Sequence, residues 1–179
     1  MKWLFLLVAM VLVAGVFAAG CTDEENPGPV SLPAADAILP GQALMVIGNV
    51  TGDGIAGGTI DTMTFTVGLV PGHSPVNMEN LSIIYADAIR TETLKPVQGF
   101  HGDPPEGYWG IMDVQNVVGN PNDRLEYEEH FVIRINPRAP LVPRQFITII
   151  VSLPSGTPLT IRRVSPPRIM KENNLLTPI

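Results

Sequence analysis

Residues 60–70, IDTMTFTVGLV, alternate between apolar side chains and small or polar ones. The apolar positions are Met63, Phe65, Val67 and Leu69. A period of two is typical of a β-strand with one buried face, because successive side chains point to opposite sides of the sheet. The stretch therefore predicts a strand that places Phe65 in a core and its threonine neighbours, Thr64 and Thr66, on the outer face.

The rest of the chain after Gln42 contains further short apolar runs of the length of a β-strand. Pro (18) and Gly (17) fall between these runs, in turn-like stretches such as VPGHSP and LPSGTP. Seven or eight short strands in this spacing predict an all-β fold, an antiparallel β-sandwich. The other strands are expected at residues 43–50, 81–88, 107–114, 130–136, 146–153 and 158–164.

Two segments are less regular. The run at 93–100 contains Pro96, which has no N–H for a sheet ladder, so this strand is expected at a sheet edge. Residues 123–131, DRLEYEEHF, could form one helical turn, although they carry no apolar stripe.

The N-terminus has a different character from the body. Lys2 is followed by eighteen residues, 3–20, without a charge or a strongly polar group. As one short apolar helix this run would be about 27 Å long, just under the ~30 Å hydrocarbon core of a bilayer. It is expected to be a removed signal peptide or a marginal membrane anchor, and a buried core helix is the weaker alternative.

The single cysteine stands at the end of this run. Ala18-Ala19-Gly20-Cys21 resembles a lipoprotein processing box, in which a cysteine receives a lipid and becomes the mature N-terminus. The acidic, proline-rich stretch that follows reads as a tether. Lipidation of Cys21 and an uncleaved membrane helix with an incidental cysteine both remain open. The expected organisation is residues 1–20 as signal or anchor, 21–41 as tether and 42–179 as body.

Composition excludes several classes of function. One cysteine forms no internal disulfide, and with three scattered histidines it builds no zinc site. A net charge of -6 makes nucleic acid and acidic membrane surfaces poor partners. No metal, no cofactor and no small-molecule substrate are expected.

Candidate modification sites come from two sequons. Asn49-Val50-Thr51 and Asn80-Leu81-Ser82 fit the N-glycosylation pattern, and both fall near the ends of expected strands.

The ionisable residues give weaker indications. His101 and Asp103 share one loop and could be read as a base with an orienting acid, but no nucleophile motif accompanies them. Arg162 and Arg163 are neighbours in an expected strand, so at most one of them can pair inward. The remaining acids lack the spacing of a calcium loop and are expected to be solvated; they are Asp53, Asp103, Asp113, Asp123, Glu126, Glu128 and Glu129.

Residues 43–87 and 146–176 resemble the outer domain of archaellins, the archaeal flagellins. The resemblance is carried by an ordered series: a strand ending in GNVTGDG, a glycine-rich loop, the IDTMTF strand, PGHSPV, and a strand ending in YAD. LPSGTPLTI and the close PPRI match the C-terminal end, and YEEHFVIRIN (127–136) fits the strand before it. The resemblance implies an immunoglobulin-like β-sandwich and frequent glycosylation.

The N-terminus departs from that family. Archaellins carry a basic-Gly processing site and a long apolar helix that packs the filament core. Here Lys2 is followed by Trp3, and Pro27 and Pro29 end any helix soon after residue 20.

The expected function is therefore that of a non-enzymatic structural protein at the cell surface, outside the cytoplasm. Its archaellin-like body would be held at the membrane by a lipid or by residues 3–20, with archaellum or S-layer proteins as candidate partners. One alternative is a true filament subunit with an atypical start. Another is a ligand-binding surface lipoprotein.

Overall fold

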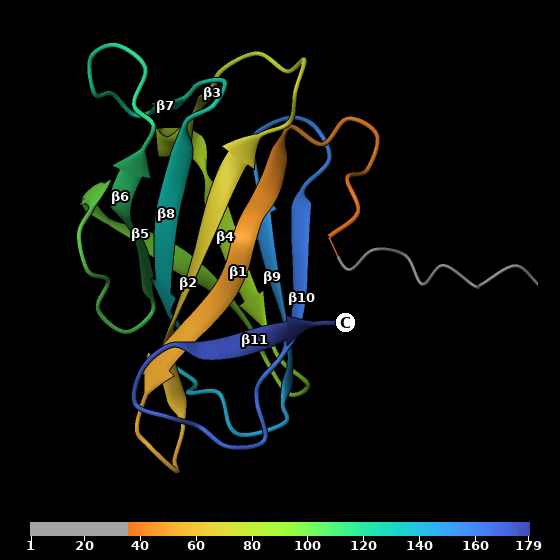
Figure 1. Cartoon of the computed structure of the whole chain (residues 1–179), viewed down its shortest axis with the longest axis vertical. Helices are drawn as coiled ribbons and strands as arrows, with labels where there is room; N and C mark the ends of the chain where they lie inside the picture. The colour runs from red at the N-terminus through yellow and green to blue at the C-terminus, as the bar shows by residue number, and fades with distance from the viewer. Residues whose placement is uncertain (1–35) are drawn as a thin grey trace, which may run out of the picture. The chain divides into compact units, whose positions relative to one another are not determined.

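The computed structural model describes residues 36–179 (Figure 1). The predicted N-terminal helix, Cys21 and most of the predicted tether lie outside the described residues. Within residues 36–179 no helix is long and apolar enough to cross a membrane.

The described part is all-β apart from one 3₁₀ turn, as the alternation predicts. Its elements are β1 (Leu44–Gly54), β2 (Ile60–Leu69), β3 (Val76–Asn77), η1 (Met78–Asn80), β4 (Ser82–Ala86), β5 (Thr91–His101), β6 (Tyr108–Gln115), β7 (Arg124–Leu125), β8 (His130–Asn136), β9 (Phe146–Ser152), β10 (Leu159–Val164) and β11 (Asn174–Pro178).

Nine strands close into one ring, in the order β1-β11-β10-β9-β4-β5-β6-β8-β2, and β3 and β7 form a separate two-stranded pair. Two strands close the ring by changing partner along their length. β5 pairs with β4 at residues 91–94 and with β6 from Lys95 onward. β11 pairs with β1 at residues 174–176 and with β10 at residues 177–178. A strand that changes partner in this way turns a corner between two packed sheet faces.

The ring corrects the expected two separate antiparallel sheets. β5 and β6 run parallel, and hydrogen bonding continues around both corners. β5 also has a neighbour on each side, so the expectation of an edge strand was wrong for the strand as a whole. Pro96 lies beyond the last pair with β4, Ile83 with Leu94, so its missing N–H breaks no bond on that side.

The core fills the space between the sheet faces. The side chains of Phe65 on β2, Ile133 on β8 and Ile149 on β9 are at most 1% exposed, as alternation on each strand predicts. Thr64 and Thr66 are half-buried on the outer side of β2. The prediction for residues 60–70 is confirmed.

Three short strands, β3, β7 and β11, were not predicted, nor was the 3₁₀ turn η1. β7 lies where a helical turn was an alternative, and it pairs with β3. β11 follows a proline-rich loop and is only five residues long. Its partners β1 and β10 are distant in sequence, so local periodicity alone does not reveal it.

Most connections lie at the two ends of the barrel, and the β5–β6 connection, residues 102–107, runs along one side, as Figure 1 shows. We call the two ends the upper and lower ends, as they are oriented in that view. The upper-end loops are residues 70–75, 116–129 and 153–158, with η1 beside them. The lower-end loops are residues 55–59, 87–90, 137–145 and 165–173.

Candidate functional site

Both sequon asparagines are exposed. Asn49 follows Gly48, whose φ of 70° is a left-handed conformation that favours glycine, and the pairing of β1 with β2 shifts register between Ile47 and Thr51. The bulge places Asn49 on the surface of the strand. Asn80 ends the 3₁₀ turn at the upper end. Both side chains are accessible to a glycan, so the two sites remain predictions that the exposure supports.

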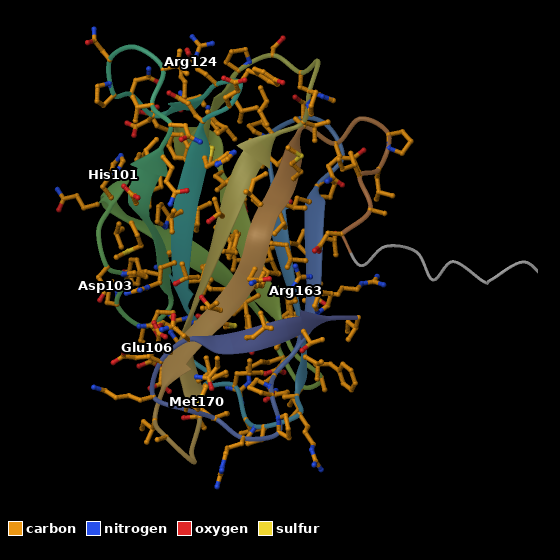
Figure 2. All side chains as sticks on the ribbon, viewed as in Figure 1. His101, Asp103, Glu106, Arg124, Arg163 and Met170 are labelled. Carbon is orange, nitrogen blue, oxygen red and sulfur yellow. The ribbon has the colours of Figure 1, made fainter. Side chains whose placement is uncertain are left out.

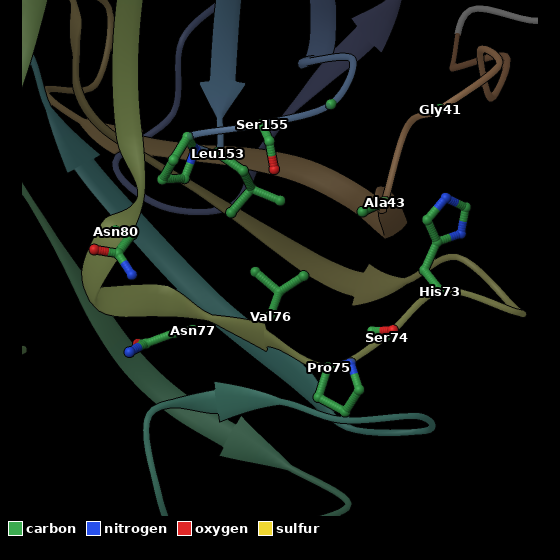
Figure 3. A pocket seen from close by; sticks show the side chains of 12 residues that line it. Gly41, Ala43, His73, Ser74, Pro75, Val76, Asn77, Asn80, Leu153 and Ser155 are labelled. Carbon is green, nitrogen blue, oxygen red and sulfur yellow. The ribbon is translucent and has the colours of Figure 1, made fainter.

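Asn80 also lines a hollow of the upper end, which has a volume of about 440 Å³ (Figure 3). Its wall joins the segment ahead of β1, the loop after β2 and the β9–β10 loop. His73, Ser74, Asn77 and Ser155 supply polar groups to it, and no lysine, arginine or carboxylate lines it. The lining can accept a neutral polar group, and it assembles no acid, base or nucleophile set.

The His101 side chain pairs with Asp123 and not with Asp103. The distance between His101 Nε2 and Asp123 Oδ1 is 2.7 Å, and both groups are partly exposed. Asp103 accepts instead from Arg134 at 3.0 Å. The possible reading of Asp103 as the orienting acid of His101 is therefore wrong, because the β5–β6 connection turns Asp103 toward β8. The His101–Asp123 pair joins β5 to the 116–129 loop. No Ser, Thr or Cys side chain lines the hollow over this pair.

The acids do not converge on a metal site. Within residues 36–179 no group of three or more His, Cys, Asp or Glu side chains is placed to hold an ion. Glu129 departs from the expected solvated carboxylate, since it is only 2% exposed. Its two oxygens accept from the backbone N–H groups of Val118 at 2.7 Å and Glu126 at 3.0 Å. It therefore holds the upper-end loop together from inside.

Arg162 and Arg163 point in opposite directions, as their strand positions predict. Arg162 is exposed, and Arg163 is 1% exposed. The Arg163 guanidinium donates to both carboxylate oxygens of Asp36, with N–O distances of 2.8 and 2.6 Å. Asp36 had been placed in the predicted tether, so its role as the partner was missed. No local pattern connects two residues that are 127 positions apart.

The family model for archaeal-type flagellin matches residues 42–163. The chain belongs to the archaeal-type flagellin family. The match begins at the residue where the predicted body begins and covers the ring from β1 into β10. β11, which closes this flagellin-type ring, lies beyond the matched range.

Solved archaeal flagellins share this fold. The flagellin FlaB1 from Methanocaldococcus jannaschii matches with 14% identity and a TM-score of 0.57, over 76% of this chain and 98% of that one. The archaeal flagellum of Methanospirillum hungatei strain JF1 matches with 12% identity and a TM-score of 0.52, over 75% of this chain and 70% of that one. No curated protein is detectably similar in sequence. At such identities the likeness is one of fold.

Proposed function

We propose that this archaeal-type flagellin is a non-enzymatic structural protein of the cell surface that serves the archaellum or the cell envelope. The observation that carries the proposal is the family match, which covers the ring from Gln42 to Arg163. The family's members are structural proteins. The filled barrel interior supports the same view, since its volume is occupied by apolar side chains and offers no internal ligand chamber.

The N-terminal segment holds this body at the membrane. Lipidation of Cys21 and retention of residues 3–20 as a membrane helix are the two forms of anchorage. Two acyl chains hold a protein firmly and one chain only marginally, because each buried CH₂ contributes about 0.8 kcal/mol.

Intact mass of the protein isolated from native membranes distinguishes the two forms. A mass that begins at Cys21 and carries a two-chain lipid supports lipidation, and Cys21→Ser should then block processing. A mass that includes residues 3–20 with an unmodified Cys21 rejects lipidation and leaves the helix as anchor. Release of an unlipidated, cleaved protein into the medium would contradict membrane anchorage altogether.

The same measurement tests the two sequons. We propose that Asn49 and Asn80 carry glycans, because both side chains are exposed beside turns or bulges. Asn49→Gln and Asn80→Gln should each remove one glycan mass and leave the rest of the spectrum unchanged. Native mass equal to that of the bare chain would reject both sites.

A second function, that of a filament subunit, is favoured by the fold shared with the Methanospirillum hungatei flagellum. The two functions differ in assembly. Archaellin filaments depend on long apolar helices, whereas Pro27 and Pro29 interrupt this chain soon after its apolar run. We therefore expect mature protein to form no ordered filaments in electron micrographs. Filaments assembled from mature protein alone would reject the first function and show that the protein is a filament subunit.

A further inference from the structure

Hydrogen bonds join three of the four lower-end loops. Ile60 and Leu141 exchange two backbone hydrogen bonds, at 2.8 and 2.7 Å, which join β2 to the 137–145 loop. Gly57 N–H donates to Ile169 O at 2.8 Å and joins the β1–β2 loop to the 165–173 loop. The Ser165 hydroxyl donates to Val142 O at 2.6 Å. These bonds hold the 55–59, 137–145 and 165–173 loops in fixed relative positions.

Each lower-end loop presents one large apolar side chain to solvent. These side chains are Ile55, Ile89, Val142 and Met170, with exposures of 63%, 84%, 47% and 55%. Met170 marks this end in Figure 2. Single exposed apolar residues are ordinary, but here every loop at one end of the barrel carries one.

The same loops also carry five cations. Arg90, Arg138, Arg144, Arg168 and Lys171 lie in the lower-end loops, which contain only two acids, Asp87 and Glu172, for a net charge of +3. The Asp87 carboxylate is turned inward, with 3% of its side chain exposed, and accepts from the N–H groups of Ile89 and Arg90.

Arg138 is neutralised by the nearly buried Glu92, at 2.6 Å, and Asp61 and Glu106 line the hollow beside it. Lys171 pairs with Glu172 at 3.4 Å, and Arg90 lies 3.8 Å from Asp87, so among the described residues Arg144 and Arg168 are the two lower-end cations without an ion pair. The upper end has the opposite character: with η1 it carries five acids, namely Glu79, Asp123, Glu126, Glu128 and Glu129, against the single cation Arg124. The four lower-end loops are thus net positive in a chain with a net charge of -6, and Asp61 and Glu106 are acids that lie beside them.

Asp36, the first described residue, lies beside β10 on the flank of the barrel. Arg163 is the second-to-last residue of β10, directly ahead of the 165–173 loop, and it holds Asp36 by two hydrogen bonds. Cys21 stands 15 positions before Asp36, a stretch that spans at most about 50 Å when extended. The 11-residue β1 is about 36 Å long by comparison. An anchor at or ahead of Cys21 can therefore reach a membrane that contacts the lower end.

We propose that the lower end of the body docks on a bilayer surface that carries anionic phosphate headgroups. The four apolar side chains enter the headgroup region, and Arg90, Arg144, Arg168 and Lys171 face the phosphates. Apolar tips on separate loops that also carry cations fit a soft surface that closes around each tip. Each cation near an anionic surface contributes about fivefold to binding, which corresponds to ~1 kcal/mol. The contact is weak for a free body and strong for one already tethered to that membrane.

The membrane as partner rests on the anchorage proposed above, but docking can be tested without the anchor. Every pair of strands in the ring lies within residues 36–179. The Methanocaldococcus jannaschii flagellin, 98% of whose solved chain matches the body, adopts this fold. The body alone is therefore a suitable test protein, and far-UV circular dichroism with a cooperative thermal transition verifies each variant.

The experiment is co-sedimentation of the body with vesicles of phosphatidylcholine, with and without phosphatidylglycerol. We expect binding to the anionic vesicles alone, with a steep loss as salt rises. Arg144→Gln with Arg168→Gln should weaken binding about 25-fold. Ile89→Ser should weaken it several-fold and leave its salt dependence intact. Arg124→Gln at the upper end and Arg162→Gln on the outer face of β10 are matched controls that should bind as the wild type does.

Three results would overturn docking: no binding to anionic vesicles, equal binding to neutral ones, or equal loss in the Arg124→Gln control. Sedimentation velocity without lipid covers the competing occupant, the acidic upper end of a second copy. Self-association that Arg144→Gln with Arg168→Gln abolishes, together with no vesicle binding, would assign the lower end to that contact. None of these results bears on Cys21, so the anchorage is judged separately from native mass.

Discussion

Arg163 and Asp36 join the end of β10 to the segment ahead of β1 through two charged hydrogen bonds, at 2.8 and 2.6 Å. The guanidinium is buried, and 27% of the aspartate side chain is exposed. The pair therefore sets the point at which the upstream chain leaves the barrel. It is also the only described ion pair whose cation is fully buried.

The first prediction concerns this pair. Asp36→Asn leaves a buried guanidinium without its counter-charge and should lower the free energy of unfolding by about 2–4 kcal/mol. This loss is smaller than for a fully buried ion pair, because Asp36 is partly solvated. Asp36→Asn combined with Arg163→Met should recover most of the loss, since no buried charge then remains. Urea denaturation of the body measures both. Glu172→Gln, which removes the exposed partner of Lys171, is the matched control and should change stability by less than about 1 kcal/mol.

The second prediction concerns the strand that alternation defines most clearly. Phe65 is 1% exposed within the core cluster, so Phe65→Ala should cost about 3–5 kcal/mol. Thr64, one position away, lies on the outer side, where its hydroxyl accepts from Arg134 Nε at 3.2 Å. Thr64→Ala should therefore cost no more than about 1 kcal/mol. Equal losses in thermal or urea unfolding would contradict the assignment of the two faces.

Local patterns predicted the strands well, because each depends only on its own sequence of apolar and polar positions. β2, β8 and β9 lie within a residue or two of their expected ranges. Periodicity does not specify which strand lies beside which. The parallel β5–β6 pair and the corner strand β11 depend on partners elsewhere in the chain, and neither was predicted.

The same limit applies to the side chains. The sequons could be located because a sequon is a local motif, and the opposite directions of Arg162 and Arg163 follow from strand geometry. The partner of Arg163 lies 127 positions away, and the partner of His101 lies 22 positions away, across a loop. The proximity of Asp103 to His101 in sequence indicated the wrong partner. Only the closed ring shows that lower-end loops from four parts of the chain lie at one end of the barrel.

The third prediction concerns Tyr85, whose hydroxyl lies in the core without a hydrogen-bond partner among the described residues. Burial, followed by the negative charge of Asp87, raises the pKa of Tyr85 above its ordinary value of about 10. Below pH 10 the hydroxyl is protonated in both states and contributes no pH dependence. Above pH 10 the unfolded chain releases this proton while the native state retains it, so stability falls as the pH rises.

Tyr85→Phe separates the cost of burying the unpaired hydroxyl from the loss of stability at alkaline pH. At neutral pH the variant should be as stable as the wild type or about 1 kcal/mol more stable, because it removes an unpaired buried hydroxyl. Between pH 10 and 11 its stability should fall less steeply than that of the wild type, as measured by urea unfolding at each pH. Tyr127→Phe, at a tyrosine that is 58% exposed, should retain the wild-type slope. A steep alkaline loss that persists in Tyr85→Phe would assign the slope to other groups.

The last prediction concerns Glu129, the buried carboxylate that joins Val118 and Glu126 inside the upper-end loop. Each bond runs from a neutral N–H to a charged oxygen, and such bonds contribute about 1.5–3 kcal/mol. Val118 is exposed and Glu126 is half-buried, so water can replace part of each bond once the carboxylate is gone. Glu129→Ala should therefore cost about 1.5–3 kcal/mol in total, the value of one such bond and not of two. Glu129→Gln retains one carbonyl oxygen and should cost about half as much.

Amide hydrogen exchange should quicken at Val118 and Glu126 in both variants, while the amides of β2 and β8 exchange at rates set by global stability. Glu128→Gln, at the exposed neighbouring position, is the matched control and should leave both amides protected. Unchanged protection at Val118 in Glu129→Ala would show that the loop is held by other contacts, such as the His101–Asp123 pair.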